Sequence, residues 1–343
     1  MTLNSSMLLA AAALTLTVSA SLANSAEAQR IAPAVNDAAI AEKGMPRKLA
    51  EYGFFIDSNA QIPAARVVPY SLNTPLYSDG AVKLRFAYVP EGQQAAADGE
   101  GLLEFPVGSA LIKTFAFGEG DDRRLIETRV LLHRAEGWVA LPYRWNAEQT
   151  EARLAIAGGR LEVDTAEHGT ISYRIPNKNQ CKQCHSLGDA VMPIGPKARN
   201  LSGAWLSDFS NAGYLDAIPD GHDTMPLWSA RQDVSLNDAA RAYLDVNCAH
   251  CHRPEGKASN SGLDLRWEQD DQTAVGIRKR PVSAGQGSGG FNFSIVPGDP
   301  TRSIMVHRMN SDNPGVAMPE LGKTTVDKEG VDIIRRWIAE MDE

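Results

Sequence analysis

Residues 247–256 read NCAHCHRPEG, which places two cysteines three positions apart and a histidine directly after the second. The same arrangement occurs again as CKQCH at residues 181–185, and the two segments hold all 4 cysteines of the chain. C-x-x-C-H is the signature of covalent haem attachment, in which two thiols bind the porphyrin and the adjacent imidazole coordinates the iron. The sequence therefore predicts two covalently attached haem c groups. One is expected at Cys181, Cys184 and His185, and the other at Cys248, Cys251 and His252.

Paired cysteines can also bind zinc or close disulfide bonds. A four-cysteine zinc site usually separates its pairs by about 15–20 residues, whereas 63 residues lie between Cys184 and Cys248. Disulfides suit an exported chain but leave both trailing histidines without a role. With 7 histidines among 343 residues, a histidine after both pairs by chance is improbable. We therefore favour haem, and zinc and disulfides are the alternatives.

Helical geometry distinguishes the two histidines of the second motif. Cys248 and His252 are four positions apart, so they share one face of a helical turn, and Cys251 adjoins that face. His250 projects to another side at 3.6 residues per turn. We therefore expect His252 to be the iron ligand and His250 to be a solvated spacer.

The flanks of the second motif predict two helices. Ser235 can cap an amphipathic helix that leads to Cys248, and Thr325 or Asp327 can cap a terminal helix. Between them lies the loop PGVAMPELG at residues 314–322. This order resembles the cytochrome c fold. The resemblance implies that Met318 is the sixth iron ligand, and Met309 is the competing candidate.

Residues 29–175 have a different pattern, with short β-rich runs separated by turn residues. The runs lie at residues 102–117, 124–145, 152–163 and 170–176, and the second of them predicts a hairpin turning at 135–137. We expect a β-rich, sandwich-like N-terminal domain, followed by mainly α, cytochrome c-like haem domains in a multidomain chain.

The first haem-binding segment, residues 176–233, is short for a self-sufficient domain. We therefore expect the β-rich domain or the second haem domain, residues 234–343, to supply part of its wall. The sequence does not decide which residue is the sixth ligand of the first haem iron. Met225 is well spaced from His185, Met192 follows too closely, and His222 or a site open to water are the alternatives.

Several longer stretches carry a family resemblance beyond the generic haem motifs. They are YSLNTPLYSDGAVKLRFAYVPEG (70–92), ALPYRWNAEQTEARL (140–154), PNKNQCKQCHS (176–186), PIGPKARNL (193–201), ARAYLDVNCAHCHRP (240–254) and MPELG (318–322). Together they resemble a family of exported dihaem c-type cytochromes with a β-rich N-terminal region. The resemblance runs from about Pro46 to the end. It implies architecture and cofactor and leaves the substrate open.

The N-terminus predicts export. An apolar run beginning at Met7 is followed by small residues, so residues 1–28 are expected to be a signal peptide cleaved after Ala23 or Ala28. The run is short for a membrane span, and we expect no stable membrane insertion after cleavage. The net charge of -8 argues against nucleic acid as a partner.

The sequence thus predicts a soluble bacterial periplasmic protein that carries electrons between other redox proteins. The alternative is a haem-dependent, peroxidase-like oxidoreductase with an open first haem or a substrate site in the β-rich domain. Whether the chain is an enzyme stays open at this point.

Overall fold

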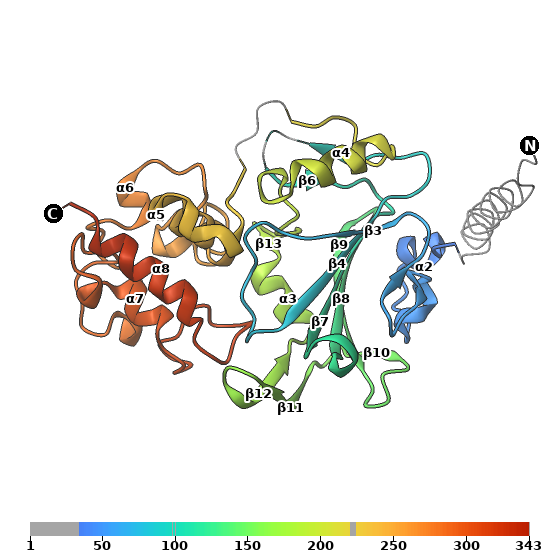
Figure 1. The fold of residues 1–343 in the computed structure, drawn as a ribbon, viewed down its shortest axis with the longest axis horizontal. Coiled ribbons are helices and arrows are strands. Elements are labelled where there is room, and N and C mark those ends of the chain that lie inside the picture. Colours follow the sequence, from blue (N-terminus) through green and yellow to red (C-terminus); the bar gives the residue numbers. More distant parts are fainter. Residues whose placement is uncertain (1–33, 98, 100, 220–223, 343) are drawn as a thin grey trace, which may run out of the picture.

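A six-stranded antiparallel sheet lies at the centre of the molecule (Figure 1). The computed structural model describes residues 34–97, 99, 101–219 and 224–342, so the predicted signal peptide lies outside the described residues. Across the sheet the order is β10-β9-β8-β7-β4-β3. These strands are β3 (Val67–Tyr70), β4 (Val82–Tyr88), β7 (Ala110–Phe117), β8 (Arg124–Arg134), β9 (Gly137–Trp145) and β10 (Ala152–Leu154).

Four small two-stranded sheets and several short helices surround it. The paired strands are β1 (Phe55–Asp57) with β2 (Ile62–Pro63), β5 (Ala96–Ala97) with β6 (Leu103–Glu104), β11 (Gly159–Thr165) with β12 (Gly169–Ile175), and β13 (Ser186–Leu187) with β14 (Ala190–Val191). The α-helices are α2 (Asp37–Ala41), α3 (Lys178–Cys184), α4 (Gly203–Asn211), α5 (Leu236–Asn247), α6 (Gln272–Val275), α7 (Ile304–Met309) and α8 (Lys328–Ala339).

The hairpin of β8 and β9 confirms the predicted turn. Arg134 pairs with Gly137, which leaves a two-residue loop. Gly137 adopts a φ of 109°, a value open to glycine and strained for other residues. This tight turn sets the register of the two longest strands of the sheet.

One face of the sheet carries a continuous apolar core. Phe86, Ile112, Val130 and Leu141 are neighbours across four strands and are all buried. The N-terminal segment with α2, β1 and β2 covers this face. Alternation along each strand therefore directs the intervening residues to the opposite face.

The opposite face is apolar at both ends and charged in the middle. At one end, Leu111 and Ala87 pack with α4 through Phe209. At the other end, Phe115 and Phe117 pack against the hairpin of β11 and β12. Helix α3 lies over the middle and contacts β9, so the sheet presents charged side chains toward the first cysteine pair.

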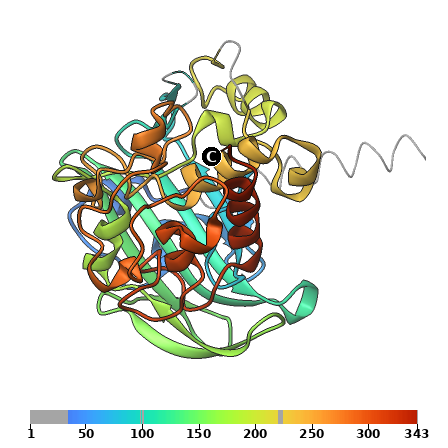
Figure 2. The ribbon, with the colours of Figure 1, turned by 90° about the vertical axis from the view of Figure 1, so that its left-hand side faces the viewer.

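The C-terminal segment lies on the same side of the sheet as this face (Figure 2), and it contacts the loop that precedes β4, where the Tyr77 amide donates to Asn247. Its α5 and α8 begin as predicted: the Ser235 side chain accepts from the Asp238 amide, and Asp327, one of the two expected caps, accepts from Gly330. The two helices approach closely at Gly330, where a Cβ atom would lie 2.3 Å from the Tyr243 ring. Only glycine fits this crossing.

The predicted fold class is wrong in its haem domains. Residues 176–233 contain α3 and α4, of 7 and 9 residues, and these pack against the sheet. In residues 234–342, helices α5, α6, α7 and α8 have 12, 4, 6 and 12 residues, and most of the segment runs in turns and loops. The chain is β-rich, and neither segment is a mainly α, cytochrome c-like domain.

The β-rich N-terminal half is present, but as one six-stranded sheet with flanking hairpins instead of a sandwich of two large sheets. The sequence signals behind these predictions act only over short stretches of the chain. Caps and apolar periodicity indicate where α5 and α8 begin, but they do not report how the chain runs between them. That connecting chain includes the glycine-rich stretch GQGSGG at 285–290, which disfavours helix.

Candidate functional site

Helix α3 presents the first cysteine pair. Asn177 caps the helix by accepting from the Gln180 amide, and Gln180 accepts from the Asn177 amide in return. Cys181 and Cys184 lie on this capped helix, and His185 follows as its C-terminal cap. The three residues of the motif therefore occupy one ordered turn, as haem attachment requires.

His185 is held in one orientation. Its Nδ1 lies 3.1 Å from the carbonyl oxygen of Met192, and a carbonyl can only accept, so Nδ1 carries the proton. Histidines that bind metals commonly donate one ring N–H to such a partner, which orients the other nitrogen. The arrangement leaves Nε2 of His185 as the atom available to a metal.

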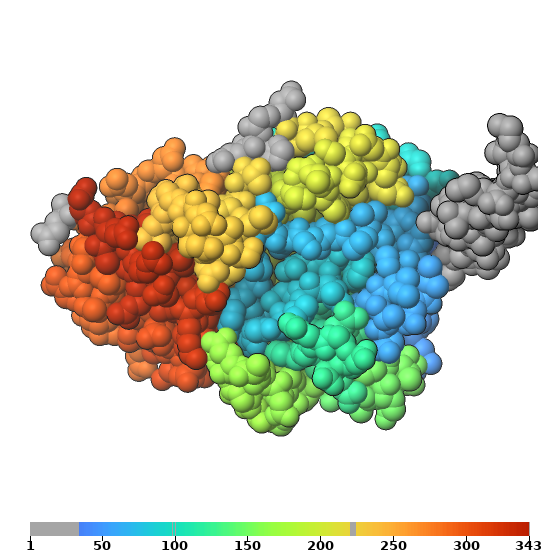
Figure 3. Space-filling model, viewed as in Figure 1, coloured from blue at the N-terminus to red at the C-terminus, as the bar shows by residue number. Residues whose placement is uncertain are grey.

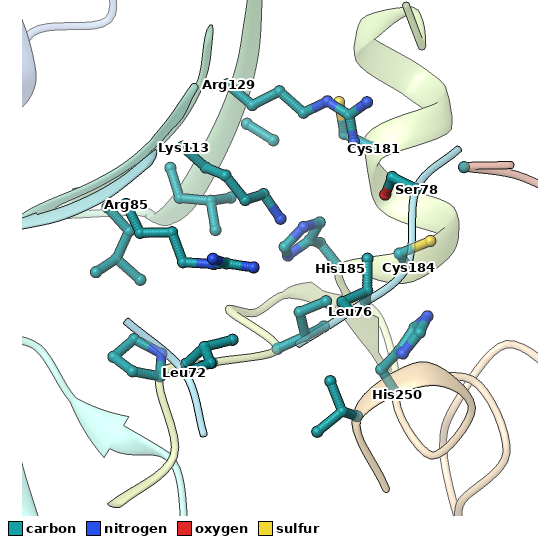
Figure 4. Close-up of a pocket in the computed structure, with 18 of the residues that line it drawn as sticks. Leu72, Leu76, Ser78, Arg85, Lys113, Arg129, Cys181, Cys184, His185 and His250 are labelled. Atoms are coloured by element: carbon teal, nitrogen blue, oxygen red, sulfur yellow. The ribbon is translucent and has the colours of Figure 1, made fainter. Parts of the chain in front are cut away.

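The first cavity lies between α3 and the sheet (Figure 4). It contains about 1530 Å³ of space free of protein atoms, part of it open to solvent. Cys181, Cys184 and His185 all line it, and its walls include the side chains of Leu72 and Leu76. The lining combines apolar side chains with the cysteines and histidine of the motif, which is the mixture that a site for an organic cofactor needs.

The second motif continues from the end of α5. The Cys248 amide donates to Leu244 and the His252 amide donates to Cys248, so the chain keeps helical turns through the motif. His252 Nδ1 lies 3.0 Å from Oγ of Ser261. That hydroxyl donates to the Ala258 carbonyl at 2.6 Å, so it accepts from His252. Nε2 of His252 is again the atom left available.

The second cavity contains three of the four residues predicted to hold the second haem, and Cys251 is not among its lining residues. Cys248, His252 and Met318 line a cavity with about 670 Å³ of space free of protein atoms. Met305 and Met309 line it as well, so the cavity offers three thioether sulfurs. Met318 is placed by its amide, which donates to the Arg308 carbonyl at 3.0 Å.

The first cavity does not receive the predicted methionine. Met225 is buried, and its carbonyl accepts from Asn73 at 3.1 Å, but it lines neither of the cavities that contain His185. Met192 and His185 both line a third cavity, which is separate from the two described above. His222 lies outside the described residues.

Burial keeps both motif histidines neutral. It lowers the pKa of His185 to about 4, helped by the nearby Lys113 charge. It also lowers the pKa of His252 to about 4, with smaller contributions from His250 and Arg308. A neutral imidazole is the form that coordinates a metal, so both rings are in the binding form at neutral pH.

The two motifs touch each other. Cys251 Sγ lies 3.5 Å from the Gln183 carbonyl oxygen, and the Gly188 amide donates to Glu255 at 2.9 Å. Ligand atoms of Cys184, His250 and Cys251 lie within 4.8 Å of one another. The expectation that His250 is a solvated spacer is wrong, because its Nδ1 is buried and has no hydrogen-bond partner among the described residues.

Cys184, His250 and Cys251 could hold a metal ion such as zinc. The Cys251 thiol hydrogen bonds to Cys184 and lowers the pKa of the Cys184 thiol, and His250 acts in the same direction. Structural zinc, however, takes four ligands, and this group has three. A zinc site here would also leave Cys181, Cys248 and both oriented histidines unused.

Two of the stretches that carry the family resemblance contact the C-terminal segment. From residues 70–92, the Tyr77 amide donates to Asn247 at 2.8 Å and Asp79 accepts from the Thr325 amide at 2.8 Å. From residues 193–201, Lys197 forms an ion pair with Asp245 at 2.5 Å. Figure 3 shows the C-terminal segment, in orange and red, in contact with the sheet region along this boundary.

Sequence reasoning missed a group of cations on the sheet. Arg85, Lys113 and Arg129 line the first cavity, and each stands in the middle of a strand. Lys113 is the one residue of β7 that is not buried by the rest of the chain. A lone cation within the apolar run ALIKTFAF was the available signal, because such a residue must face either solvent or a cavity.

Every helix in the described part of the chain is too short or too polar to cross a membrane. Comparisons with protein-family models, with curated proteins and with solved structures found no match.

Proposed function

We propose that this chain is an exported dihaem c-type cytochrome that carries electrons between redox partners. The proposal rests on one observation made at both motifs. In each, the histidine that follows the cysteine pair donates from Nδ1 to a fixed acceptor, and the same residue lines a cavity together with cysteine of its own motif. That is the arrangement needed to hold a haem iron on Nε2.

Different residues of the chain would hold each of the two haem groups. When bound, each haem supplies an iron that cycles between ferric and ferrous states. Cys181 and Cys184 would anchor the first group on α3, and Cys248 and Cys251 would anchor the second. His185 and His252 would each bind one iron through Nε2, and Met318, which lines the second cavity, would be the candidate for a further ligand there.

Contact between the motifs supports electron exchange within the protein. Cys184 and Cys251 each belong to one attachment pair, and their sulfur atoms lie within 4.8 Å of each other. The two haem groups would therefore be anchored at neighbouring cysteines. His250 lies beside both sulfurs and is half-buried, with its Nδ1 atom shielded from solvent.

The test is haem loading of the full chain produced with a c-type maturation system. We expect two porphyrin groups that resist acid–acetone extraction, seen by mass spectrometry of the intact protein. The double variants Cys181→Ala/Cys184→Ala and Cys248→Ala/Cys251→Ala should each lose one group. The matched control is Met192→Leu, which should retain both. A protein that carries zinc and no covalent porphyrin would disprove the proposal.

Export belongs to the same proposal, because haem attachment by these motifs suits a periplasmic protein whose cofactor cannot be lost. The apolar leader supports it. The mature protein should begin near Asn24 or Gln29, which N-terminal sequencing of the holoprotein measures. A holoprotein that keeps Met1 would count against export with cleavage.

A second candidate is a haem-dependent oxidoreductase. One observation favours it: the described residues that line the first cavity include no methionine. The first iron could then keep a position open for peroxide or another small molecule. A high-spin haem that binds cyanide would support this candidate, whereas two low-spin, six-coordinate haems would support the carrier.

A further inference from the structure

Three cations form a row across the sheet beneath the first motif. Arg85 on β4 pairs directly with Lys113 on β7, and Lys113 pairs directly with Arg129 on β8. Residues paired in this way point to the same face, so the three side chains stand side by side. Figure 4 shows them projecting from the sheet toward His185. Like charges placed opposite each other destabilise a sheet unless an anion lies between or beside them.

The protein itself neutralises one end of the row. Arg129 donates from Nε and Nη2 to the carboxylate of Glu127, at 2.9 and 2.5 Å. The same carboxylate accepts from Tyr173 at 2.7 Å and is fully buried. Glu127 therefore already has two strong partners and is committed to Arg129.

The other two cations have no carboxylate partner among the described residues. Arg85 donates from Nη1 to the Lys83 carbonyl at 3.2 Å. The Lys113 ammonium makes one contact, with the Phe115 ring at 5.4 Å from the ring centroid. Both side chains line the first cavity beside apolar residues such as Leu72. Two unpaired cations in a largely apolar cavity are costly, because burial penalises charge that has no counter-ion.

We propose that Arg85 and Lys113 form a binding site for a carboxylate within the first cavity. A guanidinium binds a carboxylate through two parallel N–H groups, and a neighbouring ammonium adds a compact point charge. The apolar walls suit a ligand that joins a carboxylate to a planar apolar body. Two sources have this chemistry: a propionate of the first haem, in which case the proposal rests on the proposed function, or a free organic acid.

The charges of Arg85, Lys113 and Arg129 act against one another. Burial, together with the Arg129 and Arg85 charges, lowers the pKa of Lys113 to about 7. A bound carboxylate would act in the opposite direction and keep the ammonium charged. This effect accompanies the geometry and is not its basis.

The experiment compares the purified full-length protein with Arg85→Gln and Lys113→Gln, after haem content has been measured. Lys113→Arg keeps the charge and is the conservative variant. Arg144→Gln is the matched control, because Arg144 stands on β9 of the same sheet and is exposed. Circular dichroism confirms that each variant is folded. The readouts are the two midpoint potentials and the binding of benzoate by isothermal titration calorimetry.

Two results would support the site and identify the source. If the carboxylate is a propionate, one midpoint potential falls in both glutamine variants but not in Lys113→Arg or Arg144→Gln, and benzoate does not bind. If it is a free acid, benzoate binds the wild type with a saturable isotherm and binds each glutamine variant about tenfold more weakly. In that case the potentials measured without benzoate stay unchanged.

One result would overturn it: the glutamine variants match the wild type in both potentials and in benzoate binding. Failure of the proposed function is distinguishable, because it is seen beforehand as absence of covalent porphyrin. Benzoate titration of the wild type and the variants then tests the carboxylate site alone, and absence of binding would reject it.

Discussion

The two cavities differ in which parts of the chain form their walls. The second is lined by residues of one stretch, from Leu244 to Met318, and its polar groups are few. The first is lined by segments that span residues 70 to 322 and include five strands of the central sheet. The second cavity offers methionine sulfurs together with its histidine, whereas the first offers cations.

This difference explains why the residues predicted as ligands come together in one cavity and not in the other. Within a single stretch, spacing along the chain is a fair guide to which side chains meet, and Met318 lines the cavity of His252. In the first cavity, the walls come from strands far away in the sequence. Spacing from His185 then favoured Met225, which packs elsewhere, and gave no weight to Lys113, which faces the cavity.

Replacing Met318 should produce the largest effect that separates the two cavities. Met318→Ala is expected to remove the weak sulfur-to-iron band at the red end of the ferric spectrum completely. It should also lower one of the two midpoint potentials, because a thioether ligand favours the ferrous state. Visible spectroscopy and a potentiometric titration measure both, and the other potential should remain unchanged.

Met305 and Met309 provide the controls, since both line the same cavity. Met305→Leu and Met309→Leu keep the side-chain volume and should retain the band. If Met309→Leu abolishes the band and Met318→Ala does not, then Met309 is the ligand and the assignment of Met318 is wrong.

The ion pair between the two regions should give the next largest effect. Lys197, beside the first motif, pairs with Asp245 of α5, whose side chain is 0% exposed. Lys197→Met leaves a buried carboxylate without its cation, and the free energy of unfolding should fall by about 3 kcal/mol. Denaturant unfolding of the holoprotein measures this loss.

Lys43 supplies the comparison, because its side chain is 84% exposed and it pairs with Glu136 at the surface. Lys43→Met should cost at most about 1 kcal/mol. Equal losses in the two variants would show that the contact between the regions does not depend on the buried pair.

The smallest expected effect concerns how each histidine is held. His252 donates to the Ser261 side chain, whereas His185 donates to a backbone carbonyl that no substitution removes. Ser261→Ala should raise the potential of the second haem slightly, because a hydrogen bond from Nδ1 makes the imidazole a stronger donor to ferric iron. The first potential should not move.

Ser261→Thr keeps the hydroxyl and is the control, so its potentials should equal those of the wild type. A shift of both potentials in Ser261→Ala would indicate a general loosening of the structure. In that case the two histidines are not positioned independently.

Short-range features of the fold were predictable from the sequence. The starts of α5 and α8, the turn between β8 and β9, and the two C-x-x-C-H segments each depend on residues within a few positions of one another. Capping side chains, a glycine at positive φ and apolar periodicity act over that range. The two segments with the C-x-x-C-H motifs are not mainly α-helical as expected. That prediction extended local helix signals across connecting chain that is long and irregular.

The sequence by itself determined the chemistry of this protein's candidate sites: two cysteine pairs, each followed by a histidine, and a methionine in a loop ahead of the last helix. Only the tertiary structure decided that the two motifs touch, that His250 lies beside Cys184 with its Nδ1 buried, and that Met225 lies apart from His185. It alone aligned Arg85, Lys113 and Arg129, which are separated along the chain and become neighbours through strand register. Register depends on how a whole strand buries its apolar face, and no short segment contains that information.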